Sequence, residues 1–557
     1  MHRPLAMLIA LLPLALVPAA SAQDGPEASA SSGYTVRGTV INAVTNQPVA
    51  RALVSLAQDQ AVLTGSNGQF TFDNVAAGSY SVSVGKPGFQ GIGAIAGISH
   101  PNMLQRSGRS SRMPQQIQVG PDMAAVTLPI TPLAMITGRV TLSSADPADG
   151  IGIQVFGRQI QNGHPHWQSL GQTRTRSDGS FRIANLEPGS YRLSTMASLD
   201  RPGSAFNARA AVWGYPSLYY PGTTDISGAG ILTLGAGQQA EADITVVRQQ
   251  FFPVVGIVHS SSGTPASFEI LDSGGRQTGL FARFDRRDGT VHAVVPNGTW
   301  TLEARVYGQS MEWGSTTFQV SGAPASVAIN LQPIPHIPIV VRRDLSSSST
   351  TQPGDSGPGM NIELINADEM RAGAGGGMSR DDNSGSPEWH LNINEPGRYW
   401  IQAQAFPPTY ISSVTSGGVD LGSNPLAVVP GSTPAAVEVT LRDDGGTISG
   451  AIKSQTPGGN LNPVGQMPRV WVYAIPLFST ATALRNVMPN SDGHFSFYAM
   501  APGSYRLVAC DAPQEIDFHS AEGLAAWAGK GETVSVDAGG TASAELDVLH
   551  IASEEAQ

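Results

Sequence analysis

The amino-acid sequence predicts an all-β protein built as a tandem array of about five β-sandwich domains. One stretch, residues 177–195 (SDGSFRIANLEPGSYRLST), recurs along the chain, and within it apolar and polar residues alternate. Turn-forming residues are abundant, with 64 glycines and 40 prolines in 557 residues, whereas only 13% of residues are charged. Such a composition, with few long runs of helix formers, is typical of strands joined by turns.

The repeat is complete at three places and weakened at two more. Residues 66–84 (SNGQFTFDNVAAGSYSVSV) and 491–509 (SDGHFSFYAMAPGSYRLVA) match it closely, whereas residues 288–304 (DGTVHAVVPNGTWTLEA) and 388–403 (EWHLNINEPGRYWIQA) keep its skeleton. The copies lie roughly 100 residues apart, which is the length of a small domain and far exceeds one unit of a helical solenoid or one propeller blade. Each period therefore predicts one domain.

Each copy is expected to form a turn, a strand, a second turn and a second strand. Asp178 can bond its own backbone and Gly179 accepts positive φ, so the chain reverses there at little steric cost. Residues 180–183 alternate polar and apolar, and residues 190–194 do the same after Gly189. We expect two adjacent strands that each carry one apolar face, covered by a second sheet, because a lone hairpin is only marginally stable. The predicted structural turn glycines are Gly68, Gly78, Gly179, Gly189, Gly298, Gly397, Gly493 and Gly503.

The N-terminal 22 residues have the layout of a cleavable export signal. A basic start is followed by the apolar run LAMLIALLPLALV and by the small residues Ala20, Ser21 and Ala22. A membrane anchor is the alternative, but Pro13 breaks the run and it falls short of the about 20 residues that span a bilayer. We therefore expect an exported protein, periplasmic, on the outer surface or extracellular, with no transmembrane segment after signal cleavage.

The first domain resembles a known family. Its residues RGTVINAVTNQPVARALVSL, followed by SNGQFTFDNVAAGSYSVSVGKPGF, are similar to the carboxypeptidase regulatory-like domain, a transthyretin-like (prealbumin-like) β-sandwich of the carbohydrate-binding-like group. The resemblance is close over residues 36–89 and good over residues 136–195 and 447–509. It implies a transthyretin-like fold for all five domains, although the two middle ones owe this expectation mostly to their position.

The repeat positions give the expected domain boundaries. After the signal peptide (1–22) and a flexible leader (23–33), the domains are expected at 34–133, 134–250, 251–335, 336–443 and 444–551. Residues 90–116, 346–360 and 371–386 are rich in glycine and serine and are expected to be loops. Residues 520–528 have helical character.

The second domain carries an aromatic insert, WGYPSLYYPG, outside the repeat. Its rings are Trp213, Tyr215, Tyr219 and Tyr220. They are the candidate ligand-binding residues, because sugars stack on exposed aromatic faces and loops often carry function. The competing interpretation, which we favour, is that they plug the open end of the sandwich.

The sequence argues against several classes of chemistry. A net charge of −11 disfavours nucleic acid as a partner, since such binding needs clustered basic residues. Cys510 is the only cysteine, so no intrachain disulfide is possible. The lysines are Lys86, Lys453 and Lys530, and therefore domains two to four cannot hold the lysine–asparagine isopeptide bond of related pilus-type sandwiches.

No zinc peptidase site is expected, although the family module is appended to such enzymes. The one His-x-x-Glu pair, His519 and Glu522, has only His550 downstream. His164 and His166 make at most half a metal site, and a solvated hairpin tip is the simpler interpretation. We expect no cofactor, no bound metal and no catalytic residue.

Together these observations favour a non-catalytic exported protein that acts by cell-envelope or extracellular display, adhesion or protein–protein interaction. The alternative is a carbohydrate-binding protein that recognises a polysaccharide through exposed aromatic residues. A non-catalytic regulatory part of a peptidase system is a third, weaker hypothesis. The expected partners are a polysaccharide or an envelope protein.

Overall fold

The computed structural model describes eleven stretches of the chain, and almost all regular structure in them is strand. The described residues are 33–57, 60–93, 114–121, 123–200, 212–261, 267–307, 311–346, 359–370, 374–381, 388–453 and 470–550. Within them the only α-helix is α1 (Ala521–Ala526), in the segment expected to be helical, and η2 (Ile226–Gly228) is a short 3-10 turn. The predicted all-β class is therefore confirmed. The expected signal peptide and nearly all of the leader lie outside the described residues.

The five repeated sandwiches are called units one to five, in chain order. Units one and two each consist of two facing sheets. In unit one, one sheet has the strand order β4-β1-β8-β6 and the other β3-β2-β5-β7. In unit two, one sheet has the order β12-β9-β17, with β18 also paired to β9, and the other has the order β11-β10-β13-β16. The strands of unit one are β1 (Tyr34–Asn42), β2 (Leu53–Leu56), β3 (Gln60–Leu63), β4 (Gln69–Val75), β5 (Gly78–Gly85), β6 (Phe89–Gln90), β7 (Gln115–Val119) and β8 (Val126–Pro132). Those of unit two are β9 (Ala134–Leu142), β10 (Gly152–Gln161), β11 (His164–Arg174), β12 (Ser180–Leu186), β13 (Gly189–Thr195), β16 (Leu232–Leu234), β17 (Gln239–Glu241) and β18 (Ile244–Val246).

The sheet of unit three includes two short strands from the segment expected in unit two, one before the aromatic insert and one at its start. The strands of unit four form one continuous nine-stranded path of sheet. The strands of unit three are β14 (Ser198–Leu199), β15 (Val212–Tyr215), β19 (Gln249–His259), β20 (Ser267–Leu271), β21 (Arg283–Asp285), β22 (Thr290–Pro296), β23 (Gly298–Val306), β24 (Glu312–Val320), β25 (Ala325–Asn330) and β26 (Gln332–Pro333). Those of unit four are β27 (Ile337–Asp344), β28 (Met360–Asn366), β29 (Ala374–Asp381), β30 (Glu388–Ile393), β31 (Gly397–Ala405), β32 (Tyr410–Ser416), β33 (Val419–Asp420), β34 (Leu426–Val428) and β35 (Val437–Arg442).

Unit five again has two sheets, ordered β39-β36-β42 and β38-β37-β40-β41, with β43 beside β40. Its strands are β36 (Gly446–Ile452), β37 (Trp471–Pro476), β38 (Arg485–Val487), β39 (His494–Met500), β40 (Gly503–Cys510), β41 (Glu532–Val536), β42 (Thr541–Leu546) and β43 (Val548–Leu549).

All five units share one strand topology. The first strand pairs antiparallel with the strand that opens the repeat and parallel with a strand near the end of the unit: β1 with β4 and β8, β9 with β12 and β18, β19 with β22 and β25, β27 with β30 and β35, and β36 with β39 and β42. A parallel pair needs a long crossover, and here the rest of the sandwich supplies it. Units three and four share this topology although their sequences keep only the skeleton of the repeat, so the predicted tandem array is confirmed.

We expected the two strands of one repeat copy to be adjacent, and this expectation was wrong. β12 pairs with β9, whereas β13 pairs with β10 in the facing sheet. The Pro188-Gly189 turn carries the chain from one sheet to the other, with φ of 153° at Gly189. The apolar sides of the two strands therefore cover each other in one core, which contains Phe181 and Tyr191.

In the first turn of the repeat, side chains accept hydrogen bonds from the backbone. The Asp178 side chain accepts a hydrogen bond from the Ser180 backbone N at 3.0 Å, and Asp288 does the same for Thr290 at 3.0 Å. Asn67 accepts from the Gln69 backbone N at 3.1 Å. The glycines of the first turn have φ between 72° and 81°, and those of the second between 145° and 158°.

A buried aromatic side chain locks the second turn in four units. The aromatic residue lies two positions after the turn glycine. Its side chain donates a hydrogen bond to the backbone carbonyl of the residue four positions before the aromatic residue. The donor–acceptor distance is 2.9 Å for the indole of Trp300, 2.6 Å for Tyr399 and 2.7 Å for Tyr505, and Tyr191 makes the same contact. The ring thus fills the core while its polar atom satisfies a turn carbonyl.

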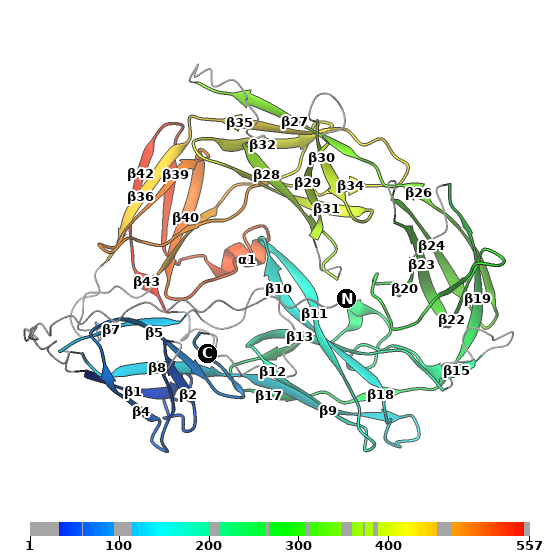
Figure 1. Cartoon of the computed structure of the whole chain (residues 1–557). Coiled ribbons are helices and arrows are strands. Elements are labelled where there is room, and N and C mark those ends of the chain that lie inside the picture. Colours follow the sequence, from blue (N-terminus) through cyan, green and yellow to red (C-terminus); the bar gives the residue numbers. More distant parts are fainter. Residues whose placement is uncertain are drawn as a thin grey trace, which may run out of the picture.

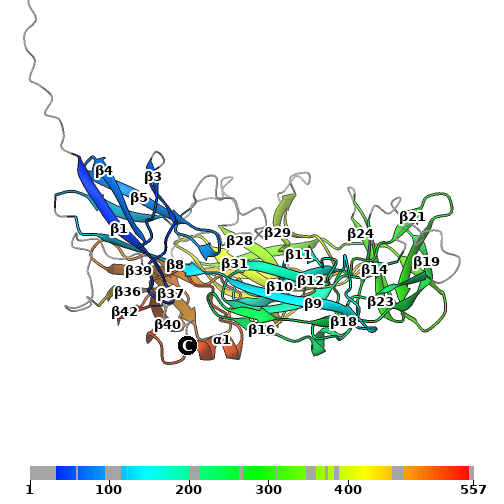
Figure 2. The same cartoon turned by 90° about the horizontal axis from the view of Figure 1, so that it is seen from below.

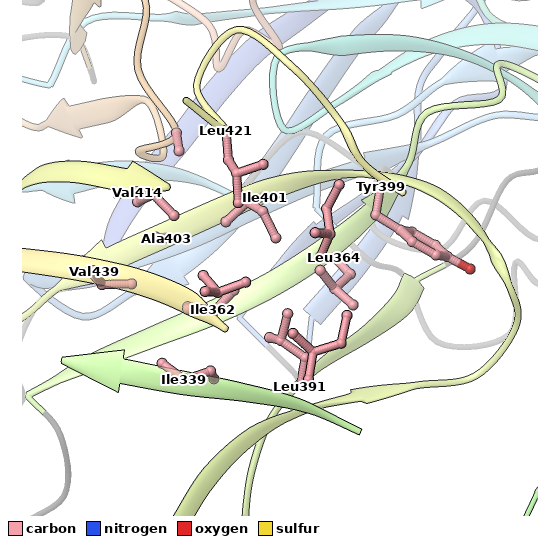
Figure 3. Packing of buried hydrophobic residues seen from close by; sticks show 14 of the residues in the cluster. Ile339, Ile362, Leu364, Leu391, Tyr399, Ile401, Ala403, Val414, Leu421 and Val439 are labelled. Atoms are coloured by element: carbon pink, nitrogen blue, oxygen red, sulfur yellow. The ribbon is translucent and has the colours of Figure 1, made fainter. Parts of the chain in front are cut away.

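Each unit has its own apolar core. In unit four, Ile339 and Val439 come from β27 and β35 and pack with Ile362 and Ile401 from β28 and β31 (Figure 3). Cys510 is buried and is the only cysteine in the sequence, so the cores of the described residues hold together without a disulfide. The core of unit four also includes Ala481 of unit five.

The five units follow one another around a ring (Figure 1). Seen from below, the strands of unit one rise out of the plane in which the other units lie (Figure 2). Consecutive units touch: Arg305 of unit three forms a 2.6 Å ion pair with Glu395 of unit four, and the Ala403 backbone N of unit four donates to the Ala481 carbonyl of unit five at 2.7 Å. The β10–β11 hairpin of unit two reaches into the middle of the ring, beside α1 of unit five (Figure 1).

Candidate functional site where units two, four and five meet

The tip of the β10–β11 hairpin contacts two units that lie far away in the sequence. The Trp167 backbone N donates to the Glu369 carbonyl of unit four at 2.7 Å. The His164 ring stacks on Trp400 of unit four, with centroids 4.7 Å apart, and on His519 of unit five, with centroids 4.1 Å apart. One hairpin thus joins three units through a column of aromatic rings.

The expectation of a solvated hairpin tip was wrong. His164 is only 7% exposed and His166 only 3%. Asn162 and Gly163 form the hairpin turn, both with positive φ, and Gly163 lies so close to the Phe518 ring that a side chain there would clash with it. The glycine needed for the turn is therefore also what lets the tip approach unit five.

Burial keeps the two stacked histidines neutral. Desolvation, together with the nearby His519 and His166, lowers the pKa of His164 to about 3. Desolvation lowers the pKa of His519 to about 4, and Asp517 opposes that shift. Burial also lowers the pKa of His166, against the influence of the Asp368 backbone and carboxylate. Close ring stacking requires neutral rings, since two imidazolium rings at this separation would repel.

The stacked histidines do not form a metal site with Glu522. Glu522 lies 3.8 Å from Arg158 of the hairpin in an exposed ion pair, whereas His519 stacks on His164 and lies against Phe518. In the part of the chain that the structure describes, no group of three histidine, cysteine, aspartate or glutamate side chains is placed to hold a metal ion. The aromatic column is a packing contact between units.

A polar cavity of about 370 Å³ lies beside the hairpin tip. Unit four contributes Asn361, Glu363, Gln402 and Gln404; unit two contributes Ile160, Asn162 and Gly163. Unit five contributes Tyr473, Ala483, Leu484, Asn486, Gln514, Glu515 and Ile516. Side-chain amides dominate this lining. None of these residues was singled out from the sequence, because the cavity exists only where three units meet.

The aromatic insert joins units two and three. β15 pairs with β19 of unit three, and Tyr219 is buried, with 1% of its surface exposed. Tyr215 and Tyr220 pack against the core of unit two. Trp213 is 46% exposed, and the Arg248 guanidinium lies 4.9 Å from its ring centroid. The four rings therefore do not form one exposed platform, and only Trp213 offers a large open surface.

A buried ion pair lies beneath the insert. Arg276 and Asp272 of unit three are 3.2 Å apart, with side chains 5% and 9% exposed. The Tyr219 hydroxyl donates to Asp272 at 3.3 Å, the Arg276 guanidinium lies 4.4 Å from the Tyr219 ring centroid, and Arg276 also donates to Ser194 of unit two. Burial raises the pKa of the Tyr219 hydroxyl, which keeps it protonated. This network fixes units two and three relative to each other.

The lysines make noncovalent contacts. Lys86 donates to the Ala50 carbonyl, Lys453 forms an exposed 3.0 Å ion pair with Asp547, and Lys530 lies 5.3 Å from the centroid of the Trp527 ring. No helix among the described residues is long and apolar enough to cross a membrane.

Comparisons with known proteins give structural likenesses and one family match. No curated protein matches the chain. The Bacillus anthracis TIE protein is 11% identical, with 54% of this chain and 50% of that chain covered and a TM-score of 0.17. A streptococcal ancillary pilin is 12% identical, with 54% and 99% covered and a TM-score of 0.19. The shaft pilin SpaA from Lactobacillus rhamnosus GG is 10% identical, with 36% and 99% covered and a TM-score of 0.14.

The family match falls on unit one, where the sequence resemblance is closest. Residues 35–95 match the model of the carboxypeptidase regulatory-like domain. This stretch covers β1 to β6, including the first copy of the repeat. The family match therefore covers unit one alone among the five sandwiches.

Proposed function

We propose that this chain is an exported, non-catalytic scaffold that acts in the cell envelope or outside the cell by display, adhesion or protein–protein interaction. The observation that carries the proposal is the hairpin of unit two, which ties units four and five to unit two across the middle of the ring. Tandem domains that touch only their neighbours would remain free to move. A ring held across its middle instead presents its loops in a fixed arrangement, which suits the display of a binding surface.

Partner capture from the producing cell's envelope tests this proposal. The intact chain is used as bait against solubilised envelope, with and without added polysaccharide, and captured proteins are identified by mass spectrometry. We expect a partner that is retained in the presence of polysaccharide. His164→Glu, which places a charge inside the aromatic column, should reduce its capture, whereas His494→Glu at an exposed site of unit five should not. Equal capture by both variants would count against a role for the fixed ring.

Polysaccharide binding by the insert is the second candidate function, and the exposed ring of Trp213 is the observation that favours it. Under this hypothesis, Trp213→Ala abolishes retention on a polysaccharide column and leaves the melting temperature nearly unchanged. Tyr219→Ala is the matched comparison: it removes a buried ring and should lower stability by about 3 to 5 kcal/mol. Unchanged retention of Trp213→Ala would remove the insert as a glycan site.

A further inference from the structure

The cavity at the junction of units two, four and five has a floor made by a regular sheet. Asn361 and Glu363 lie on β28, opposite Gln404 and Gln402 of β31 in the strand register. Their side chains point away from the core of unit four, because Ile362, between Asn361 and Glu363, and Ala403, between Gln402 and Gln404, point into it. A grid of four polar side chains on paired strands is held more rigidly than the same groups on loops would be.

The walls of the cavity come from the other two units and are polar as well. The hairpin turn supplies Asn162, β38 supplies Asn486, and the segment before α1 supplies Gln514 and Glu515. No lysine, arginine or histidine is part of the lining. The side chains of Asn162, Asn361, Glu363, Gln402, Gln404 and Asn486 make no hydrogen bond to another described residue. Their donors and acceptors are therefore available to a ligand.

The chemistry of the lining selects one class of ligand. Each amide offers both donors and acceptors, which matches a hydroxyl group that also does both. Glu363 and Glu515 disfavour an anion. A simple cation would bind amide oxygens but would leave the amide N–H donors of the lining without a partner. Ile160, Leu484 and Ile516 add apolar surface that suits the nonpolar face of a sugar ring. The volume of about 370 Å³ falls within the roughly 300–1,000 Å³ typical of small-ligand sites.

We propose that this cavity binds a neutral oligosaccharide, with the Glu363–Gln402 cross-strand pair as its principal contact. The proposal shares a ligand class with the second candidate function but places the site on β28 and β31, far from the insert in the sequence. It also goes beyond the scaffold role, since a scaffold needs no sugar. The site depends on the ring: hairpin docking supplies one wall, so the intact chain is required for binding.

The experiment uses the intact chain on an array of neutral and acidic oligosaccharides, followed by calorimetric titration of the strongest neutral binder. We expect binding to neutral glycans and at least a tenfold loss of affinity in Glu363→Ala/Gln402→Ala. The control Thr299→Ala/Gln319→Ala removes an exposed cross-strand pair of unit three and should bind like the wild type. Trp213→Ala should also bind normally. If Glu363→Ala/Gln402→Ala has a lowered melting temperature, the variant Gln404→Arg is tested in its place. Gln404 is at an exposed position, and the arginine should block the cavity by its size and charge.

Several outcomes would overturn the proposal. These are the absence of any neutral glycan binder, a preference for acidic glycans, unchanged affinity in both pocket variants, or loss of binding only in Trp213→Ala. Binding of an oligolysine peptide that is lost in the pocket variants, without any sugar binding, would assign the cavity to a cationic peptide instead. Capture of the envelope partner by Glu363→Ala/Gln402→Ala separates the scaffold proposal from the glycan-site proposal. The scaffold role predicts that this variant still captures the partner, whereas the glycan site predicts only that it loses sugar binding.

Discussion

Tyr399 and Tyr505 show how one side chain serves both a turn and a core. Their hydroxyls donate to the Glu395 and Ala501 carbonyls at 2.6 and 2.7 Å. A hydrogen bond of this kind contributes about 1 kcal/mol net, and its loss leaves a carbonyl without its partner. Tyr505→Phe should therefore lower the free energy of unfolding by about 1 kcal/mol in a urea titration. Tyr498→Phe in the exposed position of β39 is the control and should leave the midpoint unchanged.

Gly179 is a turn residue at which a side chain would do more harm than at Gly189. Its φ is 74°, and an added Cβ would lie 2.5 Å from the Val140 carbonyl oxygen. Gly189 has φ of 153° but no neighbouring atom closer than 4.0 Å to such a Cβ. Gly179→Val should destabilise unit two by at least about 1 to 3 kcal/mol, and more than Gly189→Val does, because strain and collision add. Thermal unfolding of both variants beside Gly120→Ala, which meets no neighbouring atom, tests this; equal losses at the two turn glycines would contradict it.

At the scale of elements, the strands and turns that depend on short-range sequence signals could be predicted. The alternation in residues 180–183 and the Asp-Gly turn are short-range signals, and the structure has the strand and the turn there. The sequence did not predict that the two strands of a copy lie in opposite sheets, since alternation specifies which side is apolar but not which neighbour covers it. The docking of the hairpin was also missed. One signal was available: β10 and β11 are 10 and 11 residues long, whereas β2, the corresponding strand of unit one, has 4.

The candidate site was harder to predict than the fold. Asn361 and Gln402 are ordinary polar residues on the outer face of a sheet, and only the closure of the ring turns them into the floor of a cavity. Asp272, Arg276 and Tyr219 likewise form a network only across two units. Contacts between distant segments leave no periodic pattern in a single sequence, so no local rule could have found them.

The docked hairpin should make stability depend on pH. The pKa of His164 is about 3 and that of His519 about 4 in the folded chain, below the ordinary value of 6.5. As pH falls below about 6.5 the unfolded chain takes up protons that the folded chain does not, so the stabilisation present at neutral pH is lost progressively toward pH 4. Urea midpoints measured from pH 7.5 to 4.5 should fall, and they should fall less in His164→Phe, which keeps the stack but cannot titrate. His494→Gln is the control; a pH dependence identical in all three proteins would contradict the assignment.

At the scale of the whole molecule, four kinds of contact hold the ring. Units two and three share the buried Arg276–Asp272 pair, units three and four the Arg305–Glu395 pair, and units four and five the backbone bond from Ala403. Those three contacts join neighbours in the chain and would also be compatible with an open arc. The hairpin tip is different because it joins unit two to units four and five, a contact that an open arc would lack.

Breaking the aromatic column should open the ring while each sandwich stays folded. In His164→Glu a carboxylate would replace a neutral ring between Trp400 and His519, and because burying an unpaired charge is costly we expect the tip to undock. Each unit keeps its own core, so the β-rich circular dichroism spectrum should persist. Small-angle X-ray scattering should show a larger radius of gyration and a larger maximum dimension than in wild type, whereas His494→Glu should superimpose on the wild type. If the His164→Glu curve also superimposes, the contacts between consecutive units are sufficient to hold the ring, and the hairpin only fills its centre.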